Sequence, residues 1–412
     1  MKIREDAARI IDASIRAVLP DEAVARALKG FTPPTGRLVL VALGKAAWQM
    51  AKAAADCLGG AVSDGIVITK YGHAGGDIPG LRIREAGHPV PDWNSFDATD
   101  EAIRLVEPLG ENDLVLLLIS GGGSALFEKP LCGPEALADL TGQLLRCGAD
   151  IVEMNTLRKR VSAVKGGRFA QLCAPARVFA IVLSDIVGDP LDMIASGPAY
   201  PDRSTAEQAH AVVEKYGLRL PPEVLPLLDR PLPRRLDHVE TRVTGSVREL
   251  CAAAAGACRA LGYETTVLTA SLCCEAREAG SFLASVAQYH ADTVKPLAFI
   301  AGGETVVHIT GTGLGGRNQE VALSAARGIA GLVGAAVFSV GSDGTDGPTD
   351  AAGGLVDGTT CGRLAAQGIS IDRVLSDNDA YHALVRVDGL IKTGPTGTNV
   401  NDVSVLLLRP RA

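Results

Sequence analysis

Long apolar runs are missing from this sequence. No run approaches the roughly 18 or more residues of a membrane-spanning helix, and the longest, residues 329–340, is interrupted by two glycines. The N-terminus also lacks the apolar core of a secretory signal, because five of the first nine residues are charged. We therefore expect a cytoplasmic protein without a membrane partner.

Excess positive charge and paired cysteines are missing as well. The chain has 40 Lys and Arg against 47 Asp and Glu, which gives a formal net charge of −7. An acidic chain has no overall attraction for nucleic acid, so we expect no nucleic-acid partner. The nine cysteines are odd in number and include no CxxC pair, which is typical of reduced thiols in a cytoplasmic protein.

Glycine, in contrast, is abundant. The chain has 47 glycines in 412 residues, which exceeds the usual share of about 7%. Glycine is unfavourable inside helices and strands, and it is used where the backbone turns tightly or approaches a ligand. The length and the 47% hydrophobic content are sufficient for two sizeable cores.

Short apolar runs alternate with stretches of helical periodicity, which indicates an α/β fold. In the first half, the predicted strands are residues 37–43, 64–68, 81–86, 113–119 and 176–184. The predicted helices there are residues 4–18, 45–57, 95–107 and 134–147. Five prolines between Pro221 and Pro233 then interrupt the pattern and predict a linker over residues 218–236.

The alternation resumes after this linker. The predicted strands are residues 238–244, 264–268, 295–301, 305–310, 335–340 and 403–408, and the predicted helices are residues 247–261, 275–288 and 317–328. We expect a Rossmann-like domain over residues 1–236 and a second α/β domain over residues 237–412, each with a mainly parallel open sheet flanked by helices. Two such domains predict an active site in the cleft between them. The oligomeric state stays open, with a homodimer among the alternatives.

Two glycine-containing segments follow predicted strands in the first domain. Ser120, Gly121, Gly122, Gly123 and Ser124 form a loop whose backbone amides suit a phosphate or carboxylate, although a flexible turn would use the same residues. Lys45 follows Gly44 at a predicted helix start, where a cation is unfavourable unless an anion lies nearby. A solvated lysine is the alternative there.

One segment is densely basic. Five cations lie between Arg158 and Arg168, among them Arg160 and Lys165. In an acidic chain such a segment attracts a polyanion such as a nucleotide, so we predict that Arg160 and Lys165 bind the nucleotide or substrate. A solvated helix face is the alternative.

Two acidic segments also follow predicted strands. Asp185 and Asp189 lie just past the strand at residues 176–184, where carboxylates suit Mg²⁺ but also favour turns. A second acidic loop over residues 341–350 contains Asp343 and lacks the final glutamate of an EF-hand.

Residues 311–316 match the GxGxxG pattern of a dinucleotide-binding turn, which on its own is a weak signal. The following helix opens with Arg317, Asn318 and Gln319 in place of small residues, and no acid lies at the expected distance of about 20 residues. An arginine at such a bend suits bidentate recognition of phosphoryl or carboxylate oxygens.

Together these motifs resemble the glycerate 2-kinases, a family whose C-terminal half is called the MOFRL domain and whose members have been labelled hydroxypyruvate reductases. The resemblance covers nearly the whole chain and rests on the segments LGKAA, GHPVPD, SGGGSAL, MNTLRKRVSAVKGGR, LSDIVGDPLDMIASGP, GGETVV, GGRNQE, SVGSDGTDGPTDAAGG and TGPTGTNVND. It implies a cytoplasmic two-domain α/β kinase with a MOFRL-type domain over residues 237–412. It also implies ATP and Mg²⁺ as cofactors and D-glycerate as the substrate, phosphorylated at its 2-hydroxyl.

The resemblance places the lysine of the GK motif on Lys45 and the arginine of the GGRNQE motif on Arg317. Phosphoryl transfer needs cations on the moving oxygens more than it needs a nucleophile, so both fit as catalytic residues. Asp185 and Asp189 are candidates for the metal ligand or the catalytic base. Glu304 and Asp343 are the other metal candidates.

The sequence leaves two alternatives to the kinase function open. An NAD(P)H-dependent hydroxypyruvate reductase would use the loop at residues 311–316, although no hydride-site acid with a partner is evident in the sequence. A non-catalytic ligand sensor would need an output module, and none is recognisable.

Overall fold

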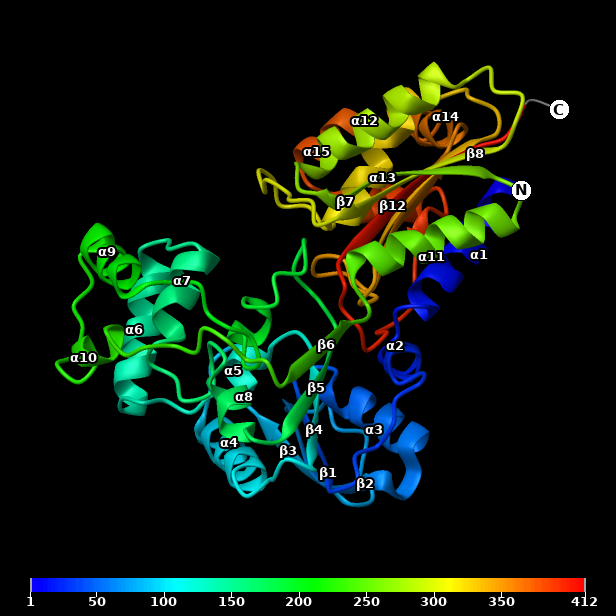
Figure 1. Cartoon of the computed structure of the whole chain (residues 1–412). Coiled ribbons are helices and arrows are strands. Elements are labelled where there is room, and N and C mark those ends of the chain that lie inside the picture. The colour runs from blue at the N-terminus through cyan, green and yellow to red at the C-terminus, as the bar shows by residue number, and fades with distance from the viewer. Residues whose placement is uncertain (1, 411–412) are drawn as a thin grey trace. The chain divides into compact units, whose positions relative to one another are not determined.

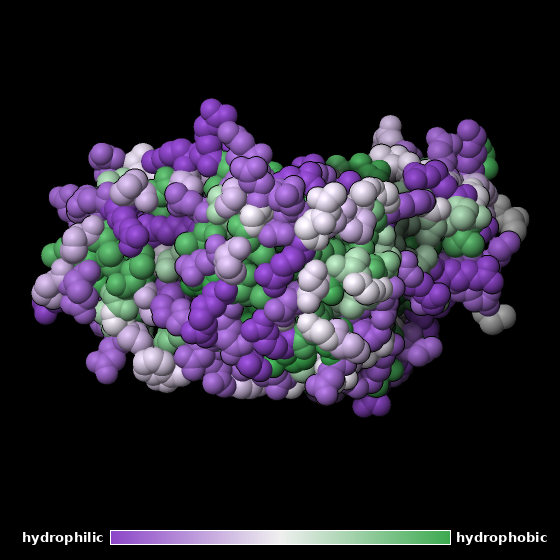
Figure 2. Space-filling model, turned by 60° about the horizontal axis from the view of Figure 1, so that its bottom comes forward, coloured by the Kyte–Doolittle hydropathy of each residue, from purple (hydrophilic) through white to green (hydrophobic). Residues whose placement is uncertain are grey.

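The computed structural model describes residues 2–410 and divides the chain into two compact units (Figure 1). The first unit runs from Ala23 to Thr244, and the second joins the N-terminal segment up to Glu22 to the chain from Gly245 onward. Within the described residues no helix is long and apolar enough to cross a membrane. Figure 2 shows hydrophilic residues spread over the visible face, with smaller groups of hydrophobic residues among them.

The first unit contains a six-stranded sheet in which every pair of neighbours is parallel. Its strand order is β3-β2-β1-β4-β5-β6, which is the order of the Rossmann fold. The strands are β1 (Leu38–Leu43), β2 (Val62–Lys70), β3 (Leu81–Ala86), β4 (Leu114–Ile119), β5 (Arg177–Val182) and β6 (Val239–Val243). The predicted parallel sheet of the first half is therefore confirmed for β1 to β5. The sixth strand, β6, was predicted at residues 238–244 for the second domain, but it pairs with β5 in the first unit.

Helices cover both faces of this sheet because β1, β4 and β5 are apolar at nearly every position. On one face, Leu38 and Leu40 pack with α3 (Ala47–Leu58) and α2 (Pro20–Ala27). On the other face, Val41 and Leu43 pack with α4 (Trp93–Val106) and α8 (Arg168–Cys173).

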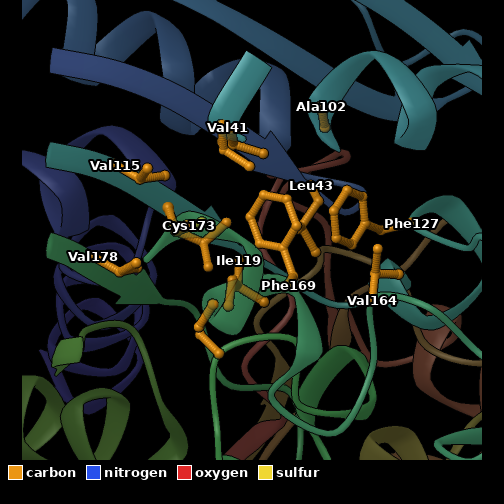
Figure 3. Packing of buried hydrophobic residues seen from close by; sticks show 14 of the residues in the cluster. Val41, Leu43, Ala102, Val115, Ile119, Phe127, Val164, Phe169, Cys173 and Val178 are labelled. Atoms are coloured by element: carbon orange, nitrogen blue, oxygen red, sulfur yellow. The ribbon is translucent and has the colours of Figure 1, made fainter. Parts of the chain in front are cut away.

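Figure 3 shows the core on the second of these faces. Val115 of β4 lies beside Val178 of β5, and the rings of Phe127 and Phe169 meet edge to face with centroids 4.9 Å apart. These rings pack the segments that follow β4 against the sheet. The other helices of the unit are α5 (Gly123–Leu126), α6 (Pro134–Arg146), α7 (Ile151–Arg158), α9 (Ala206–Tyr216) and α10 (Leu225–Leu228).

The second unit contains a six-stranded mixed sheet in the order β11-β10-β9-β12-β8-β7. Its strands are β7 (Glu264–Leu272), β8 (Leu297–Gly303), β9 (Ala335–Gly341), β10 (Gly353–Asp357), β11 (Leu390–Ile391) and β12 (Asp402–Leu408). Only β7 and β8 pair in parallel, and the other four pairs are antiparallel. The prediction of a mainly parallel second sheet was wrong, because β12 inserts antiparallel between β8 and β9.

Helices also cover both faces of the second sheet (Figure 1). One face packs on α1 (Lys2–Arg16) and α11 (Val247–Ala260), and the other on α12 (Ala276–Tyr289) and α13 (Arg317–Gly328). The shorter helices are α14 (Thr360–Ala365), α15 (Ile371–Ser376) and α16 (Ala380–Val385). Two turns of 3₁₀ helix, η1 (Gly59–Ala61) and η2 (Ile194–Ser196), belong to the first unit.

The boundaries between the units differ from the predicted 1–236 and 237–412. Helix α1 joins the second unit because Ile10 and Ile15 pack into its core and the Asp6 carboxylate accepts hydrogen bonds from Tyr263 and Arg409. The predicted linker at residues 218–236 instead packs inside the first unit, where Val224 and Leu228 are buried.

The basic segment turns its charges inward. The Lys165 ammonium lies 2.9 Å from a carboxylate oxygen of Glu128 and donates to the Phe127 carbonyl, and the two charged residues are 1% and 3% exposed. Arg160 donates to the carbonyls of Leu228 and Arg230. Buried cations of this kind need protein acceptors, and here the acceptors are present.

This pairing predicts a large stability cost for Lys165→Met. Breaking a buried ion pair by removing one partner typically costs about 3–5 kcal/mol, because the other charge stays buried and unpaired. Lys295→Met is the matched control: its pair with Glu264 is 70% and 67% exposed, and we expect a loss below about 1 kcal/mol. Urea unfolding of both variants measures the difference, and equal midpoints would contradict the assignment.

Candidate functional site

The first part of the candidate site lies at the carboxyl ends of β1 and β4. These strands are neighbours in the sheet, and the chain leaves them toward opposite faces: α3 packs on one face, and Phe127, after β4, on the other. Open parallel sheets bind their ligands at such a switch point, where two connections diverge.

Close contacts tie the loops that follow the two strands. The Lys45 amide donates to the Gly121 carbonyl at 2.8 Å, and the Ala46 amide donates to the Ser120 hydroxyl at 3.1 Å. Gly44 has φ +115°, and a Cβ atom there would lie 2.2 Å from the Ser120 hydroxyl oxygen. Only glycine allows this approach.

The Lys45 backbone is fixed while its ammonium stays available. Its carbonyl accepts hydrogen bonds from the Thr69 hydroxyl at 3.3 Å and from Nδ1 of His73 at 3.2 Å. Lys45 is half-buried, and within residues 2–410 its ammonium has no hydrogen bond or ion pair. A cation without an ion pair in the protein is suited to an anionic ligand.

The predicted glycine loop over residues 120–124 also has polar groups that are available to a ligand. The amides of Gly121, Gly122, Gly123 and Ser124 have no acceptor in the part of the chain that the structure describes. Gly122 has φ +84° and precedes the short helix α5. Successive free amides around a left-handed residue form an anion-binding concavity.

A chain of side-chain hydrogen bonds links this loop to Ser196 and Asn155. The Ser124 hydroxyl lies 2.9 Å from that of Ser196, which donates to the Asn155 side-chain oxygen at 2.8 Å. Ala195 and Ser196 have φ +52° and +59°, conformations that cost non-glycine residues energy. Such strain is typical of functional sites.

The two predicted carboxylates of this unit lie after β5. A Cβ atom on Gly121 would lie 2.2 Å from Oδ2 of Asp185, so this carboxylate adjoins the free amides. Asp189 has φ +54°, and its Oδ1 is buried without a hydrogen-bond partner among the described residues. A carboxylate oxygen beside an anion site fits a divalent cation that would bind both. Among residues 2–410, no group of three or more His, Cys, Asp or Glu is placed to hold a metal ion.

The structure does not bring Arg160 and Lys165 to this loop edge. Both are buried, and their donors point to carbonyls and to Glu128, as described above. Burial lowers the pKa of the Lys165 ammonium, since it disfavours the charged form. Their contacts within the protein support a structural role for both residues.

The second part of the candidate site belongs to the other unit and centres on Arg317, the first residue of α13. Its guanidinium makes a bidentate pair with Asp402, at 2.6 and 3.1 Å, and donates to Glu304 at 2.9 Å. Burial raises the pKa of the Asp402 carboxyl, although the guanidinium opposes this effect. The pair fixes the Arg317 fork, and about a third of the side chain stays exposed.

Asp346 holds the start of α13 in place. Its two oxygens accept the amides of Asn318 and Gln319 at 3.1 and 2.8 Å, and burial raises its pKa to about 6. Asp343, a predicted metal ligand, is half-buried nearby: a Cβ on Gly341 would lie 3.3 Å from oxygens of both Asp343 and Asp402. The structure therefore gathers Glu304, Asp343 and Arg317 around Asp402.

The GxGxxG segment does not form a dinucleotide-binding turn. The predicted strand at residues 305–310 was wrong, since this segment has a single bridge at Val306. The amides of Gly311, Thr312 and Leu314 already donate to side chains of residues 377–379. A Cβ on Gly311 or Gly313 would clash with the same segment, so these glycines serve a loop-to-loop contact.

Sequence reasoning missed several residues of both parts. Asp402 lies in the segment TGPTGTNVND, Asp346 in SVGSDGTDGPTDAAGG and Ser196 in LSDIVGDPLDMIASGP. The motifs were recognised, but their spacing did not show which polar residues would meet. The signal that could have identified these residues was their position, as polar residues without an assigned role, inside unusual segments.

Comparisons with known proteins identify the family of this chain. Residues 6–229 match the family described as "Domain of unknown function (DUF4147)", and residues 297–402 match the MOFRL family. The chain is 50% identical to the D-glycerate 2-kinase of Thermotoga maritima over 98% of both chains. It is 41% identical to the glycerate 2-kinase of Pyrococcus horikoshii over 99% of this chain and 98% of that protein.

A solved structure is equally similar. The crystal structure of glycerate kinase from Thermotoga maritima matches with a TM-score of 0.95 at 49% identity, and the match covers 99% of this chain and 100% of that chain. The chain belongs to the glycerate 2-kinase family and carries its DUF4147 and MOFRL domains.

Proposed function

We propose that this chain transfers the γ-phosphoryl group of ATP to the 2-hydroxyl of D-glycerate, giving 2-phosphoglycerate and ADP. One observation carries the proposal: Lys45, whose ammonium has no ion pair within residues 2–410, adjoins four free amides at the switch point of a parallel sheet. The names of the relatives support the same reaction.

In this proposal Lys45 and the amides of residues 121–124 hold the phosphoryl oxygens. Positive charge and oriented amides stabilise the charge of a phosphoryl group in transfer, and no protein nucleophile is needed. The backbone bonds of Lys45 hold the base of its side chain beside this loop before the substrate arrives.

Arg317 neutralises the substrate carboxylate or the transferring phosphoryl group. Its bidentate bond to Asp402 leaves the guanidinium planar, fixed and partly exposed. Glu304 and Asp343 flank it. The location of the active site between the two domains stays a prediction, as do the cytoplasmic location and the homodimer.

A divalent cation, Mg²⁺, would be held by Asp185 and Asp189 in the first unit, or by Glu304 and Asp343 in the second. Bound there, it would neutralise phosphate charge during transfer. The unpartnered Asp189 Oδ1 supports the first pair.

The alternative, a hydroxypyruvate reductase, has less support. Its proposed nucleotide loop has three amides already bonded to residues 377–379 and glycines packed against that segment. A bound pyrophosphate would have to displace these contacts.

Replacing Arg317 by alanine tests its role. We expect kcat/KM to fall by on the order of 10³-fold, the low end for a transition-state arginine. The variant also unpairs the buried Asp402, so activity is measured well below its melting temperature, and Arg317→Lys is compared. Arg327→Ala, in the last turn of the same helix, removes an exposed pair with Asp372 and should leave kcat/KM within about twofold. A loss below about tenfold for Arg317→Ala would remove this residue from the mechanism.

Lys45→Ala and Lys45→Arg should both lose activity, by roughly 10²-fold or more in kcat, because a planar fork cannot replace a compact ammonium at this close approach. Lys52→Ala is the control, since Lys52 lies further along α3 and pairs with the exposed Asp56. Near-normal turnover of the arginine variant would show that Lys45 supplies only a general positive charge.

The regiochemistry of the product is also expected to be strict. If a fixed cation holds the substrate carboxylate, the C2 hydroxyl reaches the γ-phosphate and the C3 hydroxyl lies one carbon farther away. Misplacement by about 1 Å can cost roughly 100-fold in rate. Phosphorus NMR should therefore show 2-phosphoglycerate, which enolase alone converts onward. A spectrum dominated by 3-phosphoglycerate would refute this geometry.

A further inference from the structure

His88 lies against the glycine loop and has no role in the function proposed so far. It belongs to the segment GHPVPD, directly after β3. A Cβ atom on Gly122 would lie 3.0 Å from Cδ2 and 3.1 Å from Nε2 of the His88 ring, and 3.1 Å from Cγ of Lys45. The imidazole and the free lysine therefore adjoin the same glycine.

The ring nitrogens of His88 are available. His88 is half-buried, and neither nitrogen has a hydrogen-bond partner between residues 2 and 410. Four other histidines use a ring nitrogen within the protein: His73 on the Lys45 carbonyl, His210 on Asp229, His238 on the Ala170 carbonyl and His382 on Asp379. A half-buried imidazole that has no hydrogen-bond partner in the protein and lies at an anion site is suited to a ligand.

The surroundings of His88 keep it neutral. Burial lowers its pKa, and the positive charges of Lys45, Lys70 and His73 lower it further. The nearest acid on its own segment, Asp92, accepts bonds from Tyr71 and from the Ser95 amide. A neutral imidazole has a lone pair that can accept a proton near pH 7.

We propose that His88 is a further catalytic residue, the base that accepts the proton of the glycerate C2 hydroxyl. This inference rests on the proposed kinase function. As the C2 oxygen bonds to the γ-phosphorus, the bond from that phosphorus to the β,γ-bridging oxygen breaks, ADP leaves with the electron pair, and the hydroxyl proton moves to a ring nitrogen of His88. The proton later leaves to solvent.

This assignment gives the role of base to His88 and the role of cation ligand to the carboxylates after β5. An ordinary aspartate, with a pKa of about 3.9, is a weaker base than imidazole at neutral pH. Asp185 adjoins Gly121 and Asp189 keeps a buried free oxygen, so both remain suited to the cation. The imidazole adjoins Gly122, beside the lysine that holds the phosphoryl group.

The test compares His88→Asn with wild type, and His210→Asn in the exposed helix α9 is the matched control. We expect His88→Asn to lower kcat by roughly 10²-fold or more, the usual contribution of a general base, with the KM for ATP changed less than threefold. The wild-type profile of kcat/KM against pH should fall on the acid side as His88 protonates, and this limb should be absent in the variant. Added imidazole should partly restore the activity of His88→Ala.

Wild type is assayed first, so that a failure of the proposed kinase function can be distinguished from a failure of the His88 assignment. No 2-phosphoglycerate from wild type would overturn the proposed function and this inference with it. An active wild type beside a His88→Asn variant with kcat within threefold, or with an unchanged acid limb, would overturn the His88 assignment alone. A fall in kcat without any rescue of His88→Ala by imidazole would also overturn it, because a structural role predicts that result.

Discussion

The parallel pairing of β1 with β4 is the constraint on which the candidate site depends. The chain leaves these two neighbours toward opposite faces of the sheet, so the loops that follow them diverge at its carboxyl edge. The bond from the Lys45 amide to the Gly121 carbonyl then sets the loops side by side. Gly44 permits this contact because any Cβ atom there would meet Ser120.

Pairing within the protein distinguishes the cations that stabilise the fold from those that we propose to bind the substrate. Lys159, Arg160 and Lys165 are buried, and each has carbonyl or carboxylate partners. Lys45 is half-buried and, in the described part of the chain, its ammonium has none. Arg317 is intermediate, since two carboxylates fix its guanidinium and part of it reaches solvent. Lys45 and Arg317, the two cations proposed for the substrate, both lie at the starts of helices.

Sequence reasoning predicted β1, β4 and β5 of the first sheet well because these strands are buried on both faces. Such strands appear as continuous apolar runs, as residues 114–119 do. It failed in the second sheet, where pairing direction depends on distant contacts: β12 comes from the end of the chain and lies between β8 and β9. The apolar residues at 305–310 have strand propensity, but their neighbours bond to side chains of residues 377–379 instead.

The site was predictable to a similar degree. Lys45 and residues 120–124 follow predicted strands, so their meeting at one edge could be expected. The contacts of Arg317 with Asp402 and of Asp346 with α13 join segments far apart in the sequence. The role predicted for Arg160 and Lys165 loses support for a physical reason: clustered cations indicate an anion site when they stay exposed, and burial is not visible in a local pattern.

The central claim is that this chain transfers phosphate and not hydride. The most direct measurement incubates the purified chain with ATP, Mg²⁺ and D-glycerate while ADP release is followed, and in parallel with NADH and hydroxypyruvate while NADH absorbance is followed. The account predicts ADP release that depends on D-glycerate and no NADH oxidation. Oxidation of NADH without ATP, together with no ADP release, would contradict it in favour of the reductase, and no change in either assay would favour a ligand sensor.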